Sequence, residues 1–311
     1  MEQVRMIADY SENRRLIRQK TAKVFGKIGI YTFLAIMAII VIIPFYWMLN
    51  VSFQSNNEVL NSLNTSLFPK VFSPQNYVNV FFYSSTTQGS ISFSRYLINT
   101  LVVAGFSTIG GTVFSILVAF ALARLNFKGR ELIFMILLAT MMIPGEMMVI
   151  SNYITVSRLG WTNDPGIGSY LAMIIPFFVS IFHIYLLRQT FKQIPNELYY
   201  AAKVDGCKDF KYLWRVMVPM AKSSIITVVI LKLMGAWNAY IWPDIVANEK
   251  FKLVTSWLRS SFTDQANTGS GRILLNYQMA ATVIVTVPLL LMFIFFRKYI
   301  MSGVSRSGVK G

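Results

Sequence analysis

Residues 28–57 carry no charged side chain and form a run rich in isoleucine. A helix needs about 20 apolar residues to cross the hydrocarbon core of a bilayer. Five further runs are long enough and nearly free of charge: 96–123, 132–157, 167–187, 223–245 and 273–296. The pattern predicts an all-α integral membrane protein with six transmembrane helices.

The overall composition supports this prediction. Hydrophobic residues make up 55% of the chain and charged residues 14%, whereas about a quarter of an ordinary soluble domain is charged. The single cysteine, Cys207, excludes an intrachain disulfide, and the single histidine, His183, excludes a His/Cys metal cluster. The sequence therefore predicts no cofactor, no metal and no catalytic site, and we interpret His183 as a packing residue in preference to a proton relay.

The formal net charge of +16 could indicate nucleic-acid binding, but the positions of the basic residues favour membrane topology. Lys and Arg number seven in 1–27, three in 124–130, seven in 188–222 and four from Arg297 onward. The loops on the opposite side hold six. Since cytoplasmic segments carry the excess of Lys and Arg, both termini and the loop between spans four and five are expected in the cytoplasm.

This topology divides the chain into five segments. The predicted segments are a cytoplasmic N-terminal segment 1–26, a first span 27–52, an extracytoplasmic loop 53–94, a main transmembrane domain 95–299 with a cytoplasmic loop 191–222, and a cytoplasmic tail 300–311.

Lys232 lies in the fifth apolar run, about 20 Å along a helix from Pro219. An ammonium group in the hydrocarbon core is costly, so Lys232 is expected to face a bundle interior or an aqueous cavity. Two interpretations of Lys232 stay open: its side chain forms part of the wall of a translocation path, or it forms an ion pair with another subunit. Asp244 is about three turns away, too far to be its direct partner.

Other side chains are candidates for a translocation path. Trp237, Asn238, Trp242 and Asp244 lie in the sequence "GAWNAYIWPD". The two aromatic faces and the amide suit sugars, but they also suit an interfacial aromatic belt. Glu146 follows the helix-breaking "IPG". We interpret it as a water-exposed residue at a kink, in preference to a solute contact.

The cytoplasmic stretch 197–219, "ELYYAAKVDGCKDFKYLWRVMVP", predicts two short helices. Pro195 can begin the first, Gly206 can end it, and Pro219 stops the second. Two interpretations stay open on spacing alone. The pair forms a knob for another protein, or it lies flat on anionic headgroups with its four basic residues facing lipid.

This stretch resembles the loop signature of ABC importer permeases, Glu-Ala-Ala, three residues, Gly, nine residues, Ile-x-Leu-Pro. The matching positions, with the spacing intact, are Ala201, Ala202, Gly206, Val216, Val218 and Pro219. Tyr200 stands where the family usually has Glu, which affects the acidic contact to the ATPase. The sequences "WNAYIWP" and "GVKG" are similar to the carbohydrate-uptake branch, the maltose-type second permease.

The resemblance implies a binding-protein-dependent importer in the cytoplasmic membrane of a prokaryote. Its implied partners are a second homologous permease, cytoplasmic ATP-binding subunits and an extracytoplasmic solute-binding protein, and the chain itself is then no enzyme. The implied ATPase-docking residues are Tyr200, Ala201, Ala202, Asp205, Gly206, Val216 and Pro219. The implied solute is a sugar or oligosaccharide, and glycerol phosphate or another polar solute stays open. A channel or a membrane enzyme is the alternative class.

Overall fold

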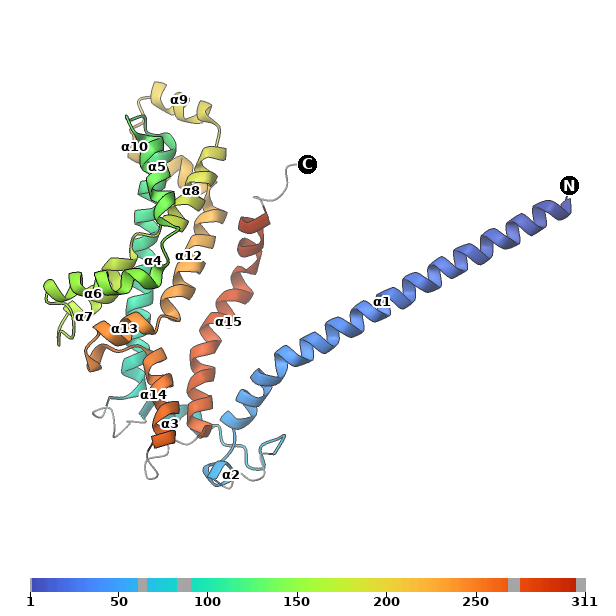
Figure 1. Cartoon of the computed structure of the whole chain (residues 1–311), viewed down its shortest axis with the longest axis horizontal. Helices are drawn as coiled ribbons and strands as arrows, with labels where there is room; N and C mark the ends of the chain where they lie inside the picture. Colours follow the sequence, from blue (N-terminus) through green and yellow to red (C-terminus); the bar gives the residue numbers. More distant parts are fainter. Residues whose placement is uncertain (1, 61–65, 83–90, 268–274, 306–311) are drawn as a thin grey trace.

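The computed structural model describes residues 2–60, 66–82, 91–267 and 275–305, with side chains from 24–60, 66–82, 91–260 and 275–299. These residues form helices and connecting turns, which confirms the all-α prediction (Figure 1). Arg272 and residues 306–311, which the charge analysis counted, lie outside this part of the chain.

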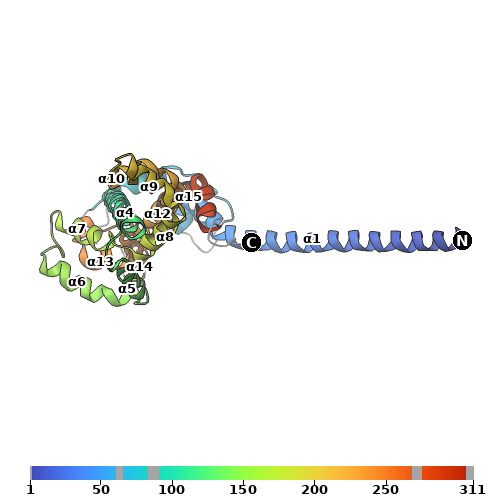
Figure 2. The same ribbon diagram turned by 90° about the horizontal axis from the view of Figure 1, so that it is seen from above.

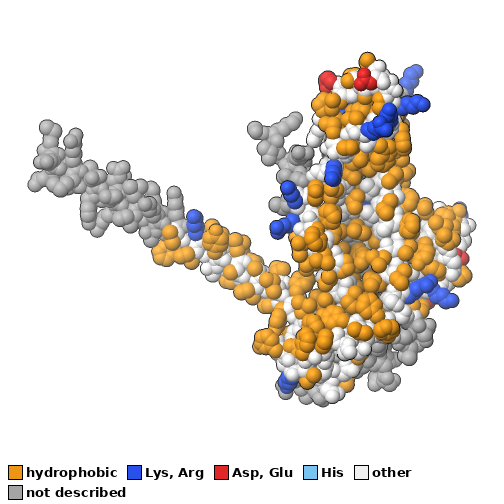
Figure 3. Space-filling model, turned by 180° about the vertical axis from the view of Figure 1, so that it is seen from behind, with side chains coloured by type: hydrophobic (Ala, Val, Ile, Leu, Met, Phe, Trp, Pro, Cys, Tyr) orange, Lys and Arg blue, Asp and Glu red, His pale blue; other side chains and the backbone are white. Residues whose placement is uncertain are grey.

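Three helices are long and apolar enough to cross a membrane without a break. They are α1 (Glu2–Ser52), α4 (Phe93–Arg124) and α15 (Leu275–Ser305), with membrane-length portions Val24–Ser52, Phe93–Arg124 and Leu275–Tyr299. The flank of the bundle is covered mainly by hydrophobic side chains, as a lipid-facing surface requires (Figure 3).

Three pairs of shorter helices qualify as spans only when each bent pair is taken together, which raises the number among the described residues to six. The helices of these pairs are α5 (Arg130–Thr140) and α6 (Met148–Arg158), α7 (Gly168–Ile174) and α8 (Ile181–Gln193), and the segment from α10 (Asp209–Tyr212) to α11 (Val218–Met220) with α12 (Lys222–Trp237). The third pair passes by length and composition, but its first half, 209–220, falls within the 191–222 loop that the charge pattern predicts to be cytoplasmic. Their bends are 86°, 46° and 85°.

The third predicted span is therefore not a straight helix. Pro144 and Gly145 lie at the bend between α5 and α6. They favour a break there, because proline removes a backbone donor and glycine weakens the helix. Pro176 lies in the short 3₁₀ turn between α7 and α8. The predicted end of span five at residue 245 is wrong, since α12 ends at Trp237 and a separate helix, α13 (Ile241–Val246), follows.

The chain reverses between two ends of the bundle (Figure 1). One end carries α9 (Asn196–Val204), α10, the start of α5 and the end of α15. The opposite end carries α2 (Asn56–Leu60), α3 (Gln75–Phe82) and α14 (Val254–Asn267). This arrangement groups the 124–130 and 191–222 loops at one end, as the charge pattern predicts.

Helix α4 is the centre of the bundle and contacts α8 and α12 along its length. Seen from above, these helices lie together while α1 projects far to one side (Figure 2). Among the described elements α1 packs mainly on α15, and its apolar side chains from Val24 to Ile43 are exposed. Its exposed part is thus available to lipid or to another subunit.

A buried asparagine joins α4 to two other elements near the α14 end. The Asn99 amide donates to the carbonyl oxygens of Lys250 and Lys252, at 3.0 and 3.1 Å. Its oxygen accepts a hydrogen bond from the Tyr170 hydroxyl, at 2.7 Å. Because Asn99 is buried, these three groups depend on it for their partners.

Asn99→Leu is expected to lower the free energy of unfolding by about 1–3 kcal/mol for each group left without a partner. Thermal unfolding of the purified chain in detergent measures this as a lower midpoint. Asn79→Leu is the matched control, because Asn79 is exposed and makes one long hydrogen bond to Tyr277, at 3.4 Å. Equal midpoints for the two variants would contradict the role of Asn99.

Candidate functional site

The segment from α9 to α11, residues 196–220, forms a compact projection at one end of the bundle (Figure 1). Helix α9 ends at a left-handed Gly206, with φ of 71°. The next amide, Cys207 N–H, donates to the carbonyl of Ala202 at 2.8 Å, which closes the turn. This confirms the predicted glycine stop, since glycine adopts positive φ without a steric penalty.

A polar clasp, formed by Tyr199, Lys203 and Asp209, ties α9 to α10. The Tyr199 hydroxyl donates to Asp209 Oδ1 at 2.6 Å, and Lys203 Nζ lies 2.7 Å from the same oxygen. Hydrogen bonds from Lys203 and then from Tyr199 hold the pKa of the Asp209 carboxyl below its ordinary value. The clasp and the Gly206 turn together fix the angle between the two helices.

The outward surface of the segment is partly apolar. Its exposed large hydrophobic side chains are Leu198, Tyr200, Val204, Phe210, Trp214 and Met220, with Val204 89% exposed. Exposed charged side chains lie among them: Glu197, Lys203, Asp205, Lys208, Lys211 and Arg215. On the inward side, Tyr199 and Ala202 pack against a buried cluster that includes Tyr212, Leu213 and Met217. The exposed apolar side chains are thus on the surface turned away from the core of the bundle.

The structure divides the residues of the predicted docking motif between two surfaces. Tyr200, Ala201, Asp205, Gly206 and Pro219 are exposed. Ala202 and Val216 are partly buried and pack on the core cluster. The two alanines of the motif therefore differ: Ala201 is exposed, and Ala202 packs the segment onto the bundle.

A cavity of about 320 Å³ lies between α4, α7, α8, α12 and α13. Its lining is mostly apolar, with polar groups from Ser107, Ser180, His183 and Lys232. The helix breaks after α7 and α12 border this cavity. Such a space, enclosed by broken helices inside a bundle, is where a membrane protein tolerates irregular backbone.

Lys232 is only 9% exposed and reaches from α12 toward α4 and the α7–α8 break. Its ammonium donates to the Phe178 carbonyl at 3.4 Å. A side-chain carbon on Gly111 would lie 2.5 Å from Lys232 Nζ, so the glycine leaves room for the ammonium. Among the described carboxylates none pairs with Lys232, so it faces the bundle interior as predicted.

Three of the predicted path residues, Trp237, Asn238 and Glu146, do not line this cavity. Trp237 is buried in a core cluster and donates to the Val285 carbonyl of α15 at 3.2 Å. Asn238 is exposed and bonds back to Met234 of its own helix. Glu146 is exposed at the α5–α6 bend. Sequence reasoning could not separate these residues because each occupies a plausible position in a span.

Asp244 lies instead in a second, polar cavity of about 170 Å³ toward the α14 end. Lys252 is 3.7 Å from Asp244 and 2.6 Å from Glu249. Asp244 therefore has a partner in its own chain, which agrees with the expectation that it does not pair with Lys232.

Trp242, whose aromatic face the sequence offered to sugars, lines the cavity and donates to the Ala172 carbonyl at 3.0 Å. Two further cavity residues were absent from the predicted path. His183, expected to be a packing residue, lines it too, with Nδ1 2.6 Å from the Ser180 hydroxyl. Ser107 adds a small polar group from α4. Only the tryptophan had a sequence signal, its place in "WNAYIWP".

Comparison with known proteins identifies the family. Residues 111–306 match the model of the binding-protein-dependent transport system inner membrane component. The chain belongs to this family. It is thus a multi-pass permease component of the inner membrane, in a transport system that relies on a binding protein, and is not itself the ATPase.

Curated relatives cover nearly the whole chain. The arabinooligosaccharides transport system permease protein AraQ of Bacillus subtilis is 32% identical over 92% of this chain and 96% of its own. The trehalose/maltose transport system permease protein MalG of Thermococcus litoralis is 29% identical, over 89% and 94%.

A solved structure shares the fold. It is the crystal structure of a bacterial ABC transporter involved in the import of the acidic polysaccharide alginate. One of its chains superposes with a TM-score of 0.76 and 22% identity, covering 89% of this chain and 96% of that one.

The clasp generates a prediction about the rigidity of the projection. Asp209→Ala is expected to speed amide hydrogen exchange in 196–212, because α9 loses its tie to α10. Asp205→Ala is the control, since Asp205 is exposed. In the wild type the folded pKa of Asp209 is lowered, so its stabilisation is full above the ordinary carboxyl pKa and is lost as pH falls through the lowered value. Equal exchange in the two variants at neutral pH would contradict the clasp.

Proposed function

We propose that this chain is the sugar-translocating permease subunit that pairs with a second, homologous permease. Cytoplasmic ATP-binding subunits dock on the α9–α11 segment, and an extracytoplasmic binding protein delivers the solute. ATP-driven closure of the ATPases moves the docked segment, and the bundle then alternates between outward and inward access. The observation that carries the proposal is the exposed apolar surface of the α9–α11 segment at the end of a membrane-spanning bundle.

Sugar is the solute class that the relatives support, since those compared are named for arabinooligosaccharides and for trehalose and maltose. The central cavity suits such a solute in part. Trp242 offers an aromatic face, and Ser107, Ser180 and Lys232 offer polar groups to hydroxyls. Lys232 is accordingly proposed as a wall of the path, and Asp244 as part of its outer approach.

The geometry of the segment favours protein docking over a position flat on the headgroups. A helix that lies in the interface buries its apolar face in the bilayer. Here the inward face packs on the core of the bundle, and the exposed apolar side chains are on the surface turned away from it. An apolar surface outside the bilayer is typical of a protein contact.

Ala201→Asp is expected to abolish co-purification of the ATPase from membranes, because it places an unpaired charge in the docking surface. Gly206→Val is expected to weaken docking by straining the turn, since valine rarely adopts φ of 71°. Ala202→Asp should in addition destabilise the segment itself, because Ala202 packs on the core.

The control for this series is Asn79→Asp, which adds the same charge at the opposite end of the bundle. Retention of the ATPase by both Ala201→Asp and Gly206→Val would refute the docking role and favour a lipid-lying pair. Absence of any ATPase from wild-type membranes would favour a channel.

Lys232→Leu is expected to leave insertion and assembly intact and to reduce sugar uptake about tenfold or more, because the cavity loses a charge-assisted donor. Uptake of a labelled sugar, chosen by screening the binding protein, measures the effect. Lys222→Leu is the control, since Lys222 is exposed on the first turn of the same helix. Wild-type uptake by Lys232→Leu would show the ammonium to be dispensable; loss of assembly would favour an ion pair between subunits.

The proposed sidedness places both termini and the α9 end in the cytoplasm and residues 53–94 outside. In a Cys207→Ser background, Ser66→Cys is expected to react with a membrane-impermeant thiol reagent in sealed cells. Lys128→Cys, in the turn between α4 and α5, should react only after permeabilisation. The reverse pattern would overturn the topology.

A further inference from the structure

Helices α4 and α8 end side by side, and each supplies an arginine to the carbonyl end of the other. Arg124 is the last residue of α4, and Arg188 lies in the last turns of α8. Both are buried, with Arg188 only 2% exposed. Both belong to the basic residues of the predicted cytoplasmic side, and neither is part of the loop motif.

Arg124 bonds to the end of α8 and to the start of α9. Its guanidinium donates to the carbonyls of Phe191, at 2.7 Å, and Ile194, which end α8. It also donates to the side-chain oxygen of Asn196, the first residue of α9. One side chain therefore links the central helix of the bundle to the first turn of the docking segment.

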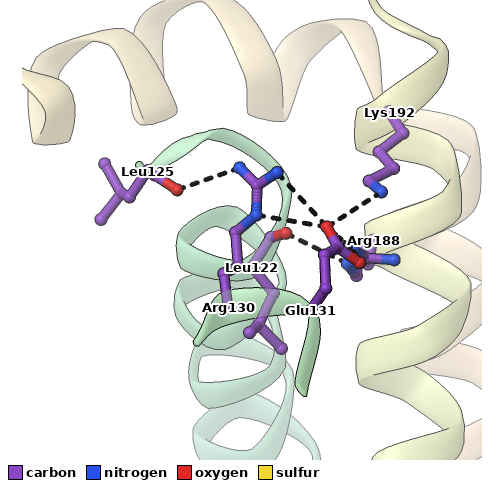
Figure 4. Close-up of polar contacts among 6 residues, drawn as sticks. All are labelled: Leu122, Leu125, Arg130, Glu131, Arg188 and Lys192. Carbon is purple, nitrogen blue, oxygen red and sulfur yellow. Dashed lines mark hydrogen bonds and ion pairs between the residues drawn. The ribbon is translucent and has the colours of Figure 1, made fainter. Parts of the chain in front are cut away.

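Arg188 makes the reciprocal contact. Its Nε donates to the Leu122 carbonyl at 3.0 Å, near the end of α4. Its Nη2 lies 2.8 and 2.7 Å from the two oxygens of Glu131, and its guanidinium lies 3.7 Å from the centre of the Phe134 ring. Figure 4 shows Arg188 and Arg130 on either side of this carboxylate, with Lys192 beside it.

The carbonyl ends of the helices make this cluster stable despite its excess of positive charge. The last carbonyls of a helix have no partner within it, and they carry the negative end of the helix dipole. Arg130 Nη1 donates to the Leu125 carbonyl at 3.1 Å. Arginines therefore donate hydrogen bonds to carbonyls at the ends of both α4 and α8. A buried guanidinium held in this way is costly to disturb, because its loss leaves several acceptors unsatisfied.

We propose that Arg124 and Arg188 form a rigid joint through which movement of the docked α9–α11 segment is transmitted to α4. This inference rests on the proposed function. Without Arg124, α9 is connected to α8 only through the chain at Ile194 and Pro195, and the hydrogen bond from α4 to Asn196 of α9 is lost. With the joint, α4, α8 and α9 move together.

Transmission to α4 matters because α4 borders the central cavity. Val103 and Ser107 of α4 line it, and Gly111 accommodates the Lys232 ammonium of α12. A displacement of α4 therefore changes the cavity and its contact with α12. Arg124 and Arg188 are positioning residues, since they touch neither the solute cavity nor the exposed docking surface.

The test follows α4 in the assembled transporter, in a Cys207→Ser background, with spin labels at Leu117 on α4 and Leu290 on α15. Both positions are exposed. Trapping with ATP and vanadate is expected to change the distance between the two spin labels in the wild type. In Arg124→Gln the shift is expected to be lost while the ATPase still co-purifies and hydrolyses ATP. Asn196→Ala, which removes only the contact to α9, should reduce the shift.

Lys128→Gln is the matched control, because it removes one charge from the same turn at an exposed position. A wild-type shift in Arg124→Gln, or no shift in the assembled wild type, would overturn the joint. Loss of the ATPase from both Arg124→Gln and Asn196→Ala would also overturn it, since the arginine would then shape the docking surface instead of transmitting movement. Failure of the proposed function is distinct, because the ATPase would then be missing from the wild type.

Discussion

Backbone hydrogen bonding within the bilayer is the constraint on which this structure depends. The hydrocarbon core offers no water to bond a free carbonyl or amide, so each helix break needs partners from the protein. The break between α7 and α8 receives them from two polar side chains. Lys232 donates to Phe178 in the α7–α8 break, and Trp242 donates to Ala172 in α7. Residues that look like solute ligands in the sequence thus also maintain the backbone.

The same constraint explains why the breaks after α7 and α12 border the cavity. Irregular backbone within the bilayer is tolerated where it is buried in protein or lines a cavity. The packing of α4 against α8 and α12 leaves this space beside Gly111, where Lys232 enters. At the α9 end the helices meet the same requirement differently, because arginines bond the terminal carbonyls of α4 and α8. The central cavity and the α9–α11 segment are then joined through one central helix, α4.

Patterns within one segment predicted the features that local chemistry determines. Apolar length gave the membrane runs, and Gly206 gave the end of α9. The predicted stop at Pro219 is wrong, because Pro219 lies within the helical segment Asp209–Met220. Features that depend on packing between segments were not predictable. The break after Trp237 has no proline or glycine at its own position, and Ala202 faces inward because of the core beneath it. The contacts of Arg124 and Arg188 join residues more than fifty positions apart.

The central claim is that the apolar surface of the α9–α11 segment contacts an ATP-binding protein and not lipid. A photo-cross-linking amino acid at Val204, which is 89% exposed, tests this most directly in native membranes. The account predicts a cross-linked product that mass spectrometry identifies as an ATP-binding subunit, and no such product from the same probe at Val41 on exposed α1. Cross-linking of Val204 to phospholipid, with no ATP-binding polypeptide, would contradict it.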